Sequence, residues 1–444
     1  MSKDTIYAPA SGLGPAGIAV IRVSGSIAGD ILDVISGVSS PEPRLATRAK
    51  LSNPMSGEAL DTGLVIWFPA PASFTGEDVV EFQIHGGKAT TEALCGALSA
   101  IDGCRLAEPG EFSRRAFFNQ KLDLTEAEGL ADLIAAETEA QRKQALRQLS
   151  GSLSKSFNHW RKELLRVLAH VEAAIDFPDE DLPPELLGNT RHKILGMSEE
   201  LTQYLDDQHR GERLREGFQI VIAGPPNVGK SSLLNYLAER DVAIVSEQAG
   251  TTRDVIEVRL DLAGFPVTVA DTAGLRTTSD EVEGEGVLRA RNRASLADLG
   301  VFVFDASCLN THDPIVELVG PDDLVVINKA DLIAELKVPS ELKEFSPIIV
   351  SLKDGTNLGA FMETLTQQVV GRFSLVGPAP ITRLRHREAL EAAVAGLERA
   401  GRAQAVELIA EDLRLATREL GRITGRVDVE DVLDVIFREF CIGK

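Results

Sequence analysis

The sequence predicts a multidomain α/β protein. An N-terminal α+β domain comes first, and a discontinuous α-helical domain then holds an inserted α/β domain. The chain has 444 residues, which is too long for one ordinary hydrophobic core. Its residue pattern changes three times: short strands give way to helical spacing, then to apolar strands alternating with helices, then to helical spacing again. We therefore expect domains at residues 1–120, 121–216, 217–375 and 376–444, the second and fourth forming one unit.

The first 120 residues mix β-rich runs with turns. Runs of strand character occupy residues 17–24, 63–68 and 78–84, and Gly and Pro residues separate them. Such short strands with intervening helices are typical of an α+β domain.

The two helical segments flank the α/β region. Apolar residues recur at helical spacing from Leu124 to Ile134 and from Leu164 to Val171, and again through residues 386–402 and 405–422. Residues 177–184 contain three prolines, which cannot continue a helix, so a loop is expected there. A helical segment on each side of a compact domain indicates an insertion.

Residues 217–375 carry near-continuous apolar strands between helical stretches. A strand of this kind that lies between helices is usually buried on both faces of a parallel sheet. The predicted strands are residues 218–224, 267–271, 300–305, 323–328 and 347–351.

The composition limits the classes of function. The net charge of −21 does not draw the chain to RNA, so any RNA contact needs a local basic patch or a partner protein. No apolar run reaches the ~18 residues that a membrane span needs, and the first ten residues lack the features of a signal peptide. We therefore expect a cytoplasmic protein. The four cysteines show no metal-ligand spacing, so zinc is not expected.

The strongest motif is the run from Gly224 to Ser231, which matches G-x-x-x-x-G-K-S between an apolar strand and a helix-like stretch. Glycines let the backbone wrap around phosphate oxygens, and successive N–H groups at a helix N-terminus supply positive potential. We expect Lys230 to reach the β- and γ-phosphates of a nucleotide and the Ser231 hydroxyl to bind Mg²⁺.

Three further motifs follow in the order that a GTPase requires. Asp271 is expected to hold Mg²⁺ through water, and the Gly274 N–H to sense the γ-phosphate. The Asp331 carboxylate can accept both donors on the Watson–Crick edge of guanine, which adenine does not present, so GTP is expected over ATP. The motif residues are Asp271, Thr272, Ala273 and Gly274, then Asn328, Lys329 and Asp331, then Ser351, Leu352 and Lys353 behind the base.

Two features concern hydrolysis. The segment from Gly250 to Asp254 resembles the first switch element of translation-factor-class GTPases, so Thr252 is the expected second Mg²⁺ ligand. Leu275 follows Gly274, where many signalling GTPases carry a glutamine that orients the attacking water. Because leucine cannot bond to water, another group must do so, or hydrolysis is slow.

The whole chain resembles the MnmE (TrmE) family of bacterial tRNA modification GTPases. The resemblance lies in the GTPase motifs and in seven further segments: Asp4–Ile6, Arg22–Gly25, Phe74–Asp78, His85–Gly87, Glu108–Ser113, Asn119–Leu124 and Phe440–Lys444.

The resemblance implies a Ras-like GTPase domain that uses K⁺ and pairing of two such domains instead of an arginine finger. Asn227 matches the K⁺-ligating asparagine, and Ser246, Gln248 and Thr251 match the loop that completes the ion site. Glu283 matches a glutamate that positions the water; taken alone, it is a solvated charge in an acidic run. The implied nucleotide and ion site also includes Val228, Gly229, Ser232, Glu247, Ala249 and Gly250.

The N-terminal domain resembles a folate-binding fold related to aminomethyltransferases. Arg22, Glu81, Lys121 and Lys444 match positions that contact 5-formyltetrahydrofolate. Arg22 and Lys121 suit the carboxylates of folate, and Glu81 suits donors on the pterin, although without the resemblance these are ordinary solvated charges. Cys441 is either a nucleophile or a tail contact near the folate pocket.

The resemblance implies that the protein hydrolyses GTP and acts with the flavoprotein MnmG (GidA). Together they would add an aminomethyl or carboxymethylaminomethyl group at C5 of the tRNA wobble uridine, with folate supplying one carbon. It also implies a homodimer through the N-terminal domain and a heterotetramer with the flavoprotein. Two alternatives remain open. One is a regulatory or assembly GTPase without RNA chemistry, and the other is a stand-alone folate-dependent aminomethyltransferase that its GTPase domain regulates.

Overall fold

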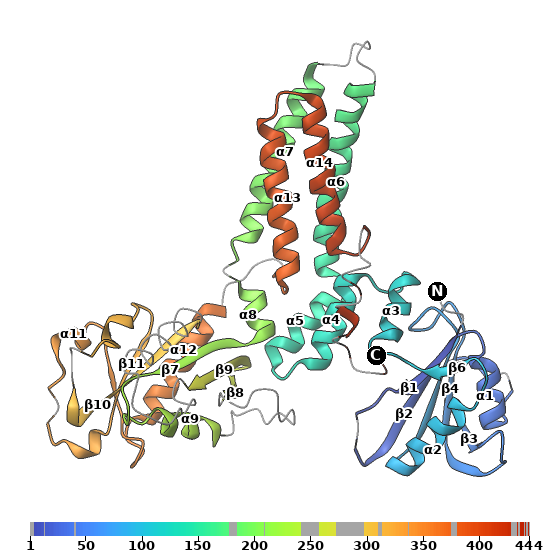
Figure 1. Cartoon of the computed structure of the whole chain (residues 1–444), viewed down its shortest axis with the longest axis horizontal. Coiled ribbons are helices and arrows are strands. Elements are labelled where there is room, and N and C mark those ends of the chain that lie inside the picture. The colour runs from blue at the N-terminus through green and yellow to red at the C-terminus, as the bar shows by residue number, and fades with distance from the viewer. Residues whose placement is uncertain are drawn as a thin grey trace, which may run out of the picture. The chain divides into compact units, whose positions relative to one another are not determined.

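The computed structural model shows two compact units, each described separately here (Figure 1). Unit 1 comprises residues 1–131, 148–186 and 403–444, and unit 2 comprises residues 132–147 and 187–402. Each unit joins a sheet to helical segments, so the predicted domain boundaries stay predictions. The structure describes residues 4–12, 14–39, 41–176, 184–207, 209–240, 257–271, 297–309, 313–335, 337–373, 380–427, 433, 436–438, 440 and 443, without the side chains of 184–189 and 271.

Unit 1 contains a six-stranded sheet with the order β3-β4-β5-β2-β1-β6. Neighbouring strands are antiparallel, except that β1 and β6 are parallel. One face packs on α1 (Ala28–Ser36) and α2 (Lys88–Ser99) through a core that includes Ile21, Phe82 and Leu98. The strands are β1 (Thr5–Pro9), β2 (Ala16–Ser24), β3 (Thr47–Ser52), β4 (Ala59–Phe68), β5 (Val79–Gly86) and β6 (Cys104–Leu106).

The helices of unit 1 begin with α3 (Glu111–Phe118) and α4 (Leu124–Ala135), whose last turn belongs to unit 2. Two long helices, α6 (Ser152–Asp176) and α14 (Val406–Ile423), run side by side (Figure 1). They are antiparallel, because Arg414 pairs with Glu172 while Gly421 lies against Arg161. Buried apolar residues recur every three or four positions along α6 and so form one face of the helix: Leu153, Phe157, Trp160, Leu164, Val167 and Val171.

Unit 2 contains the predicted parallel sheet, with the order β12-β11-β10-β7-β9-β8. Five strands lie where the sequence predicts them: β7 (Phe218–Ala223), β9 (Phe265–Asp271), β10 (Leu299–Asp305), β11 (Leu324–Asn328) and β12 (Ile348–Ile349). The sixth, β8 (Glu257–Leu262), was not predicted. It is an edge strand antiparallel to β9, and its alternation of polar and apolar residues places only Leu260 and Leu262 in the core.

Helices complete unit 2. The main ones that pack on the sheet core are α9 (Lys230–Ala238) and α12 (Leu358–Phe373), and α11 (Ser340–Lys343) is a single turn. The helices outside the sheet are α5 (Glu139–Leu149), α7 (Pro184–Leu205), α8 (Arg210–Glu216) and α13 (Leu384–Arg402). In the part of the chain that the structure describes, no helix is long and apolar enough to cross a membrane.

A buried ion cluster joins α8 to α13, at the two points where the chain enters and leaves the α/β region. Arg387 lies 2.6 Å from an oxygen of Asp207 and 2.8 Å from one of Glu212, and it also donates to the Leu205 carbonyl. Burial by itself would lower the pKa of Arg387, but these hydrogen bonds and charges raise it above its usual value. The guanidinium is therefore the ionised centre of a rigid junction.

Replacing Arg387 with Met should destabilise the protein by about 3–5 kcal/mol, because it leaves two buried carboxylates without their counter-charge. Urea unfolding followed by circular dichroism measures the change. Arg402→Met is the matched control on the same helix, since the Arg402 side chain is 78% exposed in its pair with Glu398. Equal stability of the two variants would contradict the role of the cluster.

Candidate nucleotide-binding site

The turn between β7 and α9 has the backbone shape that a phosphate loop requires. Gly224, Asn227 and Gly229 have φ values of 150°, 61° and 107°. A Cβ atom on Gly224 would lie 2.2 Å from the Val303 carbonyl oxygen of β10, so no other residue fits there. The turn therefore lies tight against the neighbouring strand, at the carboxyl end of the parallel sheet, where open α/β sheets bind ligands.

Lys230 is the first residue of α9, and its ammonium group folds back over the turn. It donates hydrogen bonds to the carbonyl oxygens of Gly224 (2.9 Å) and Pro225 (2.7 Å). A lysine in this position holds a positive charge at the N-terminus of a helix, beside exposed Ser231. Phosphate oxygens can replace the two carbonyls as acceptors without a large movement of the side chain.

The Asn328 side chain connects this turn to the other predicted loops. Its amide nitrogen donates to the Val228 carbonyl at 2.8 Å, and its amide oxygen accepts from the Leu352 N–H at 3.1 Å. The residue is 4% exposed, and a Cβ on Gly229 would lie 2.4 Å from its nitrogen. Asn328, which is predicted to act in base recognition, therefore fixes the position of the phosphate turn relative to the loop after β12.

Asp331 is held ready in the loop that follows β11. One of its oxygens accepts from the buried Ser351 hydroxyl at 2.9 Å, and the other lies 3.7 Å from the Lys353 ammonium. The structure therefore brings together the motif that ends in Asp331 and the motif that begins with Ser351, both of which are predicted to contact the base. A carboxylate with one lone pair occupied on each oxygen keeps further acceptor capacity for a base.

Lys329 has a partner that the sequence analysis missed. Its φ of 65° turns the side chain toward Asp305, and its ammonium lies 2.5 Å from that carboxylate. Burial tends to raise the pKa of Asp305, but hydrogen bonds from Lys329 and Ser307 lower it below its usual value. The sequence offered one indication of this contact. Asp305 ends a predicted strand and Asn328 ends the next one along the chain, and in the sheet the two residues lie opposite each other.

The predicted metal ligands are described only in part. The Asp271 backbone lies opposite Ile222, two residues before Gly224, which is the place that the prediction requires. Its side chain lies outside the described residues, as do Ser246, Glu247, Gln248, Ala249, Gly250, Thr251, Thr252, Thr272, Ala273, Gly274 and Glu283. Asn227, Ser231 and Ser232 are exposed at the turn. Among the described residues, no group of three or more His, Cys, Asp and Glu side chains is arranged to hold a metal ion.

The predicted folate contacts lie in unit 1. Arg22 on β2 stands opposite Glu81 on β5, and its guanidinium lies 2.9 Å from one carboxylate oxygen and 5.2 Å from the centre of the Phe74 ring. Lys121 instead donates to the Pro71 carbonyl at 3.0 Å, so no hydrogen bond or ion pair joins it to that pair. Cys441 and Lys444 lie outside the described residues. Gly443 is buried against the Pro9 carbonyl, so the tail backbone reaches the end of β1.

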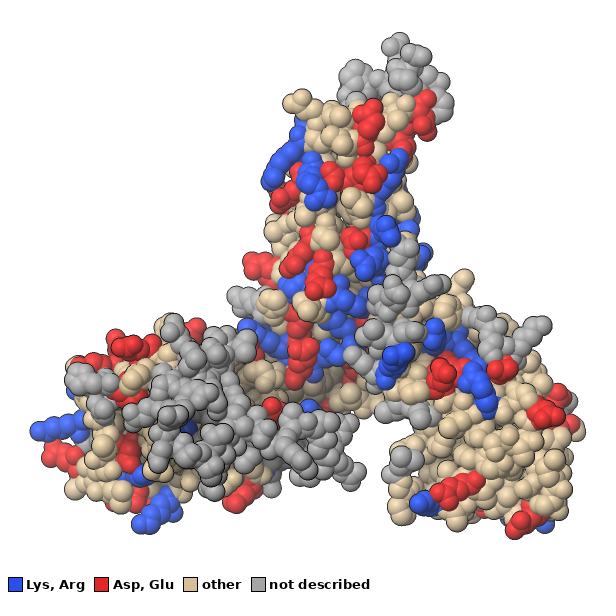
Figure 2. Space-filling view, viewed as in Figure 1, with Lys and Arg blue, Asp and Glu red and all other residues tan. Residues whose placement is uncertain are grey.

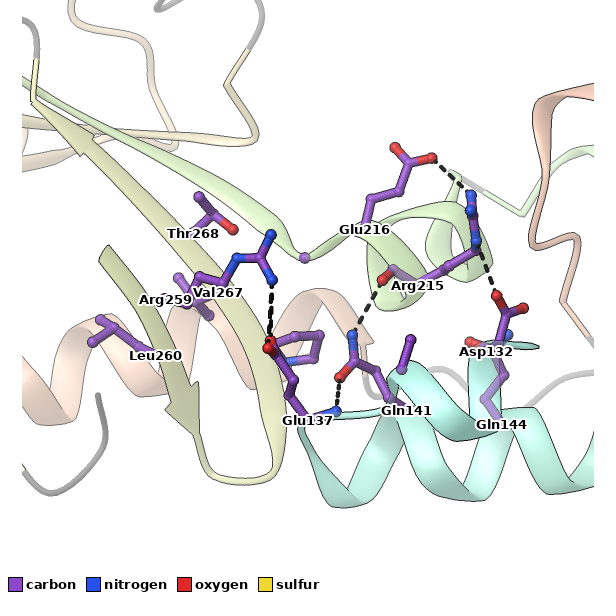
Figure 3. A pocket seen from close by; sticks show the side chains of 13 residues that line it. Asp132, Glu137, Gln141, Gln144, Arg215, Glu216, Arg259, Leu260, Val267 and Thr268 are labelled. Carbon is purple, nitrogen blue, oxygen red and sulfur yellow. Dashed lines mark hydrogen bonds and ion pairs between the residues drawn. The ribbon is translucent and has the colours of Figure 1, made fainter. Parts of the chain in front are cut away.

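A cavity of about 290 Å³ lies at the other end of the unit 2 sheet (Figure 3). Its charged walls already pair with one another: Arg215 bonds Asp132, and Arg259 approaches Glu137 at 3.4 Å. The cavity borders Gly217 and Thr268, near the amino ends of β7 and β9, whereas the phosphate turn follows the carboxyl end of β7. It is therefore separate from the candidate nucleotide site.

Two family models match this chain, one over its N-terminal residues and one over most of the rest. The model described as "MnmE helical domain" matches residues 124–441, and that described as "GTP-binding protein TrmE N-terminus" matches residues 5–121. The protein named tRNA modification GTPase MnmE of Rhodospirillum rubrum is 53% identical over 457 aligned positions, and that of Paramagnetospirillum magneticum is 54% identical over 444; each alignment covers 100% of both chains. The chain belongs to the MnmE (TrmE) family.

Family membership confirms the predicted enzyme class, a GTPase of tRNA modification, and the coarse multidomain α/β layout. A solved structure of the G domain of the T. maritima FeoB iron transporter is also similar. It covers 35% of this chain and 98% of that chain, with 22% identity and a TM-score of 0.26, and this likeness is too low to support an argument.

Replacing Asn328 with Ala should weaken GDP and GTP binding alike, by about tenfold to a hundredfold. The reason is that the Val228 carbonyl and the Leu352 N–H lose their buried partner. Isothermal titration calorimetry measures both affinities. Gln367→Ala, an exposed amide on α12, is the control. If both variants bind nucleotide as the wild type does, Asn328 does not organise the site.

Proposed function

We propose that the protein hydrolyses GTP with Mg²⁺ and K⁺. With a flavin-dependent partner, it would modify C5 of the tRNA wobble uridine using a one-carbon unit from tetrahydrofolate. The observation that carries the nucleotide part is the Asn328 amide, which fixes the phosphate turn and the base loops in one arrangement. The tRNA part draws its support from the family, whose named members are tRNA modification GTPases.

In the nucleotide site, Lys230 would exchange the carbonyls of Gly224 and Pro225 for β- and γ-phosphate oxygens. Asp331 would accept the two donors of guanine, while Ser351 and Lys353 keep its carboxylate in place. Glu283 would orient the attacking water, since Leu275 cannot. These roles give each residue a separate task in binding, selection or hydrolysis.

Two ions fit the exposed oxygen donors of the turn. Ser231, in the first turn of α9, suits Mg²⁺ together with Asp271 and Thr252. The neutral side-chain oxygen of Asn227 suits K⁺, together with Ser246, Gln248 and Thr251. When bound, the cations supply positive charge where negative charge develops on the phosphates.

In unit 1, the candidate folate site would use Arg22, Glu81 and Lys121, together with the tail residues Cys441 and Lys444. The Arg22–Glu81 pair is partly exposed, at 20% and 17%, and is therefore reachable by a ligand that offers both a carboxylate and N–H donors. The protein would work in the cytoplasm as a homodimer through its N-terminal domain and as a heterotetramer with the flavoprotein.

Replacing K⁺ by Na⁺ at constant ionic strength should lower GTP turnover at least tenfold, because an ion of different size cannot hold the same ligands. Phosphate release measures the rate. Asn227→Ala should abolish the advantage of K⁺ while GDP binding persists. Equal rates of the wild type in both salts would remove K⁺ from the proposal.

The function as a whole is tested by mass spectrometry of wobble nucleosides from cells that lack this protein. The C5-modified uridines should disappear. The wild-type gene should restore them, and Asp331→Asn should not, because the amide replaces one of the two acceptor oxygens for guanine with a donor. Unchanged wobble nucleosides in the deletion strain would favour a regulatory GTPase instead.

A further inference from the structure

Two arginines in unit 1 lie near each other. Arg161 extends from α6, and Arg426 lies just after α14. Neither guanidinium has a hydrogen bond or ion pair with the part of the chain that the structure describes. Burial lowers the pKa of Arg161, and the charge of Arg426 lowers it further. Like charges near each other disfavour each other's charged forms, and a bound anion would relieve this repulsion.

The fold fixes both arginines through glycines. A Cβ on Gly421 would lie 3.3 Å from Arg161 Nε, so the missing side chain lets the guanidinium stem lie on α14. The helix then ends in a Schellman motif, in which the Arg426 N–H donates to the Gly421 carbonyl (2.9 Å) and Gly425 adopts a φ of 80°. Gly425 also packs on the Phe117 ring, where a Cβ would lie 2.6 Å from it.

Three buried polar atoms at this place have no hydrogen-bond partner among the described residues: Arg161 Nε, Thr417 Oγ1 and Thr424 Oγ1. Thr417 and Thr424 are 6% and 2% exposed, and their spacing puts them on the same face of α14 as Gly421. An arginine offers only donors, and a hydroxyl can donate too. An oxyanion could accept a hydrogen bond from each of these three groups.

Thr424 and Arg426 open onto a cavity of about 450 Å³, with Phe117 and Gln120 among its other walls. Two carboxylates also line it, but both are already engaged. Asp123 accepts hydrogen bonds from Thr125 and Ser154, and Glu126 accepts one from the Asp123 N–H. Burial raises the pKa of Glu126. Arg426 faces the same cavity and has no ion pair with the described residues.

The surroundings match the spacing of a nucleic acid strand. Arg414, Arg418 and Arg422 recur every four residues of α14, which is a rise of about 6 Å per step, similar to the separation of successive phosphates along a strand, and Arg426 follows just after the helix. Their surface partners, such as Glu419 for Arg422, cost little to exchange. Figure 2 shows blue side chains along α6 and α14 and over α3, with red ones between them.

An aromatic residue completes this surface. Phe118 on α3 is 43% exposed, its ring stands edge-on to that of Phe117 at 5.5 Å, and Arg114 lies over it. Proteins that bind single-stranded RNA combine basic side chains for the phosphates with exposed rings on which bases stack. An acidic protein partner would leave such a ring without a role.

We propose that α3, α6 and α14 carry an RNA-binding surface, in which Arg161, Thr424 and Arg426 hold a phosphate of tRNA and Phe118 stacks on an unpaired base. The inference rests on the proposed function in tRNA modification and names the part of the chain that touches the RNA. Because the chain has a net charge of −21, any RNA contact must use a local basic surface, and α3, α6 and α14 would provide one.

The test is fluorescence anisotropy of labelled tRNA with the full-length protein, titrated between about 50 and 200 mM KCl. Arg161→Gln and Arg426→Gln should each weaken binding about tenfold at low salt and reduce the slope of log K against log salt by about 1. Phe118→Ala should weaken binding without changing that slope. GTP turnover should stay the same in all three, which shows that they fold.

Arg402→Gln, an exposed arginine on α13, is the control and should bind tRNA as the wild type does. An unchanged salt slope in Arg426→Gln would overturn the inference, and so would wild-type protein that binds no tRNA at low salt. The wobble nucleoside measurement is independent: if the deletion strain loses its modified uridines while these arginines prove inert, only the RNA surface is wrong.

Discussion

The hydrogen bonds of one buried amide, that of Asn328, determine the geometry of the nucleotide site. A phosphate loop is a row of backbone N–H groups with little side-chain packing of its own, so another element must fix its shape. Asn328 does this from β11, with a donor to the Val228 carbonyl and an acceptor for the Leu352 N–H. Each bond contributes about 1 kcal/mol, but together they make three loops move as one body.

Close packing reinforces this arrangement. Gly224 lies on the Val303 carbonyl, and Gly229 leaves room for the Asn328 amide, so any larger side chain at either place would displace the turn. Lys329 and Asp305 add a charged contact between the ends of β11 and β10. In the described residues, the carboxyl edge of the sheet is therefore held by its own contacts, and such preorganisation lowers the entropic cost of binding.

Features formed by neighbouring residues could mostly be predicted from the sequence, whereas contacts between residues far apart in the chain could not. The phosphate turn, the five apolar strands and the base motifs are local patterns, and each lies where it was expected. The link from Asn328 to Val228 spans 100 residues, so no periodicity reports it. The edge strand β8 was missed because the prediction for this region considered only near-continuous apolar runs, whereas residues 257–262 alternate polar and apolar side chains, as a half-buried edge strand does. The contact of Lys121 with Pro71 likewise spans 50 residues, and its predicted role at the folate stays a prediction.

Charge explains why an RNA contact has to be confined to a small area. With a net charge of −21, the chain repels a polyanion at a distance. At physiological salt, screening limits this repulsion to about 8 Å, so a strand that comes close responds mainly to nearby side chains. Among the described residues, neither Arg161 nor Arg426 has an ion pair, and the two carboxylates that line the cavity beside Arg426 accept hydrogen bonds of their own. The long-range repulsion then favours delivery of tRNA by a partner, while the local attraction fixes its position after delivery.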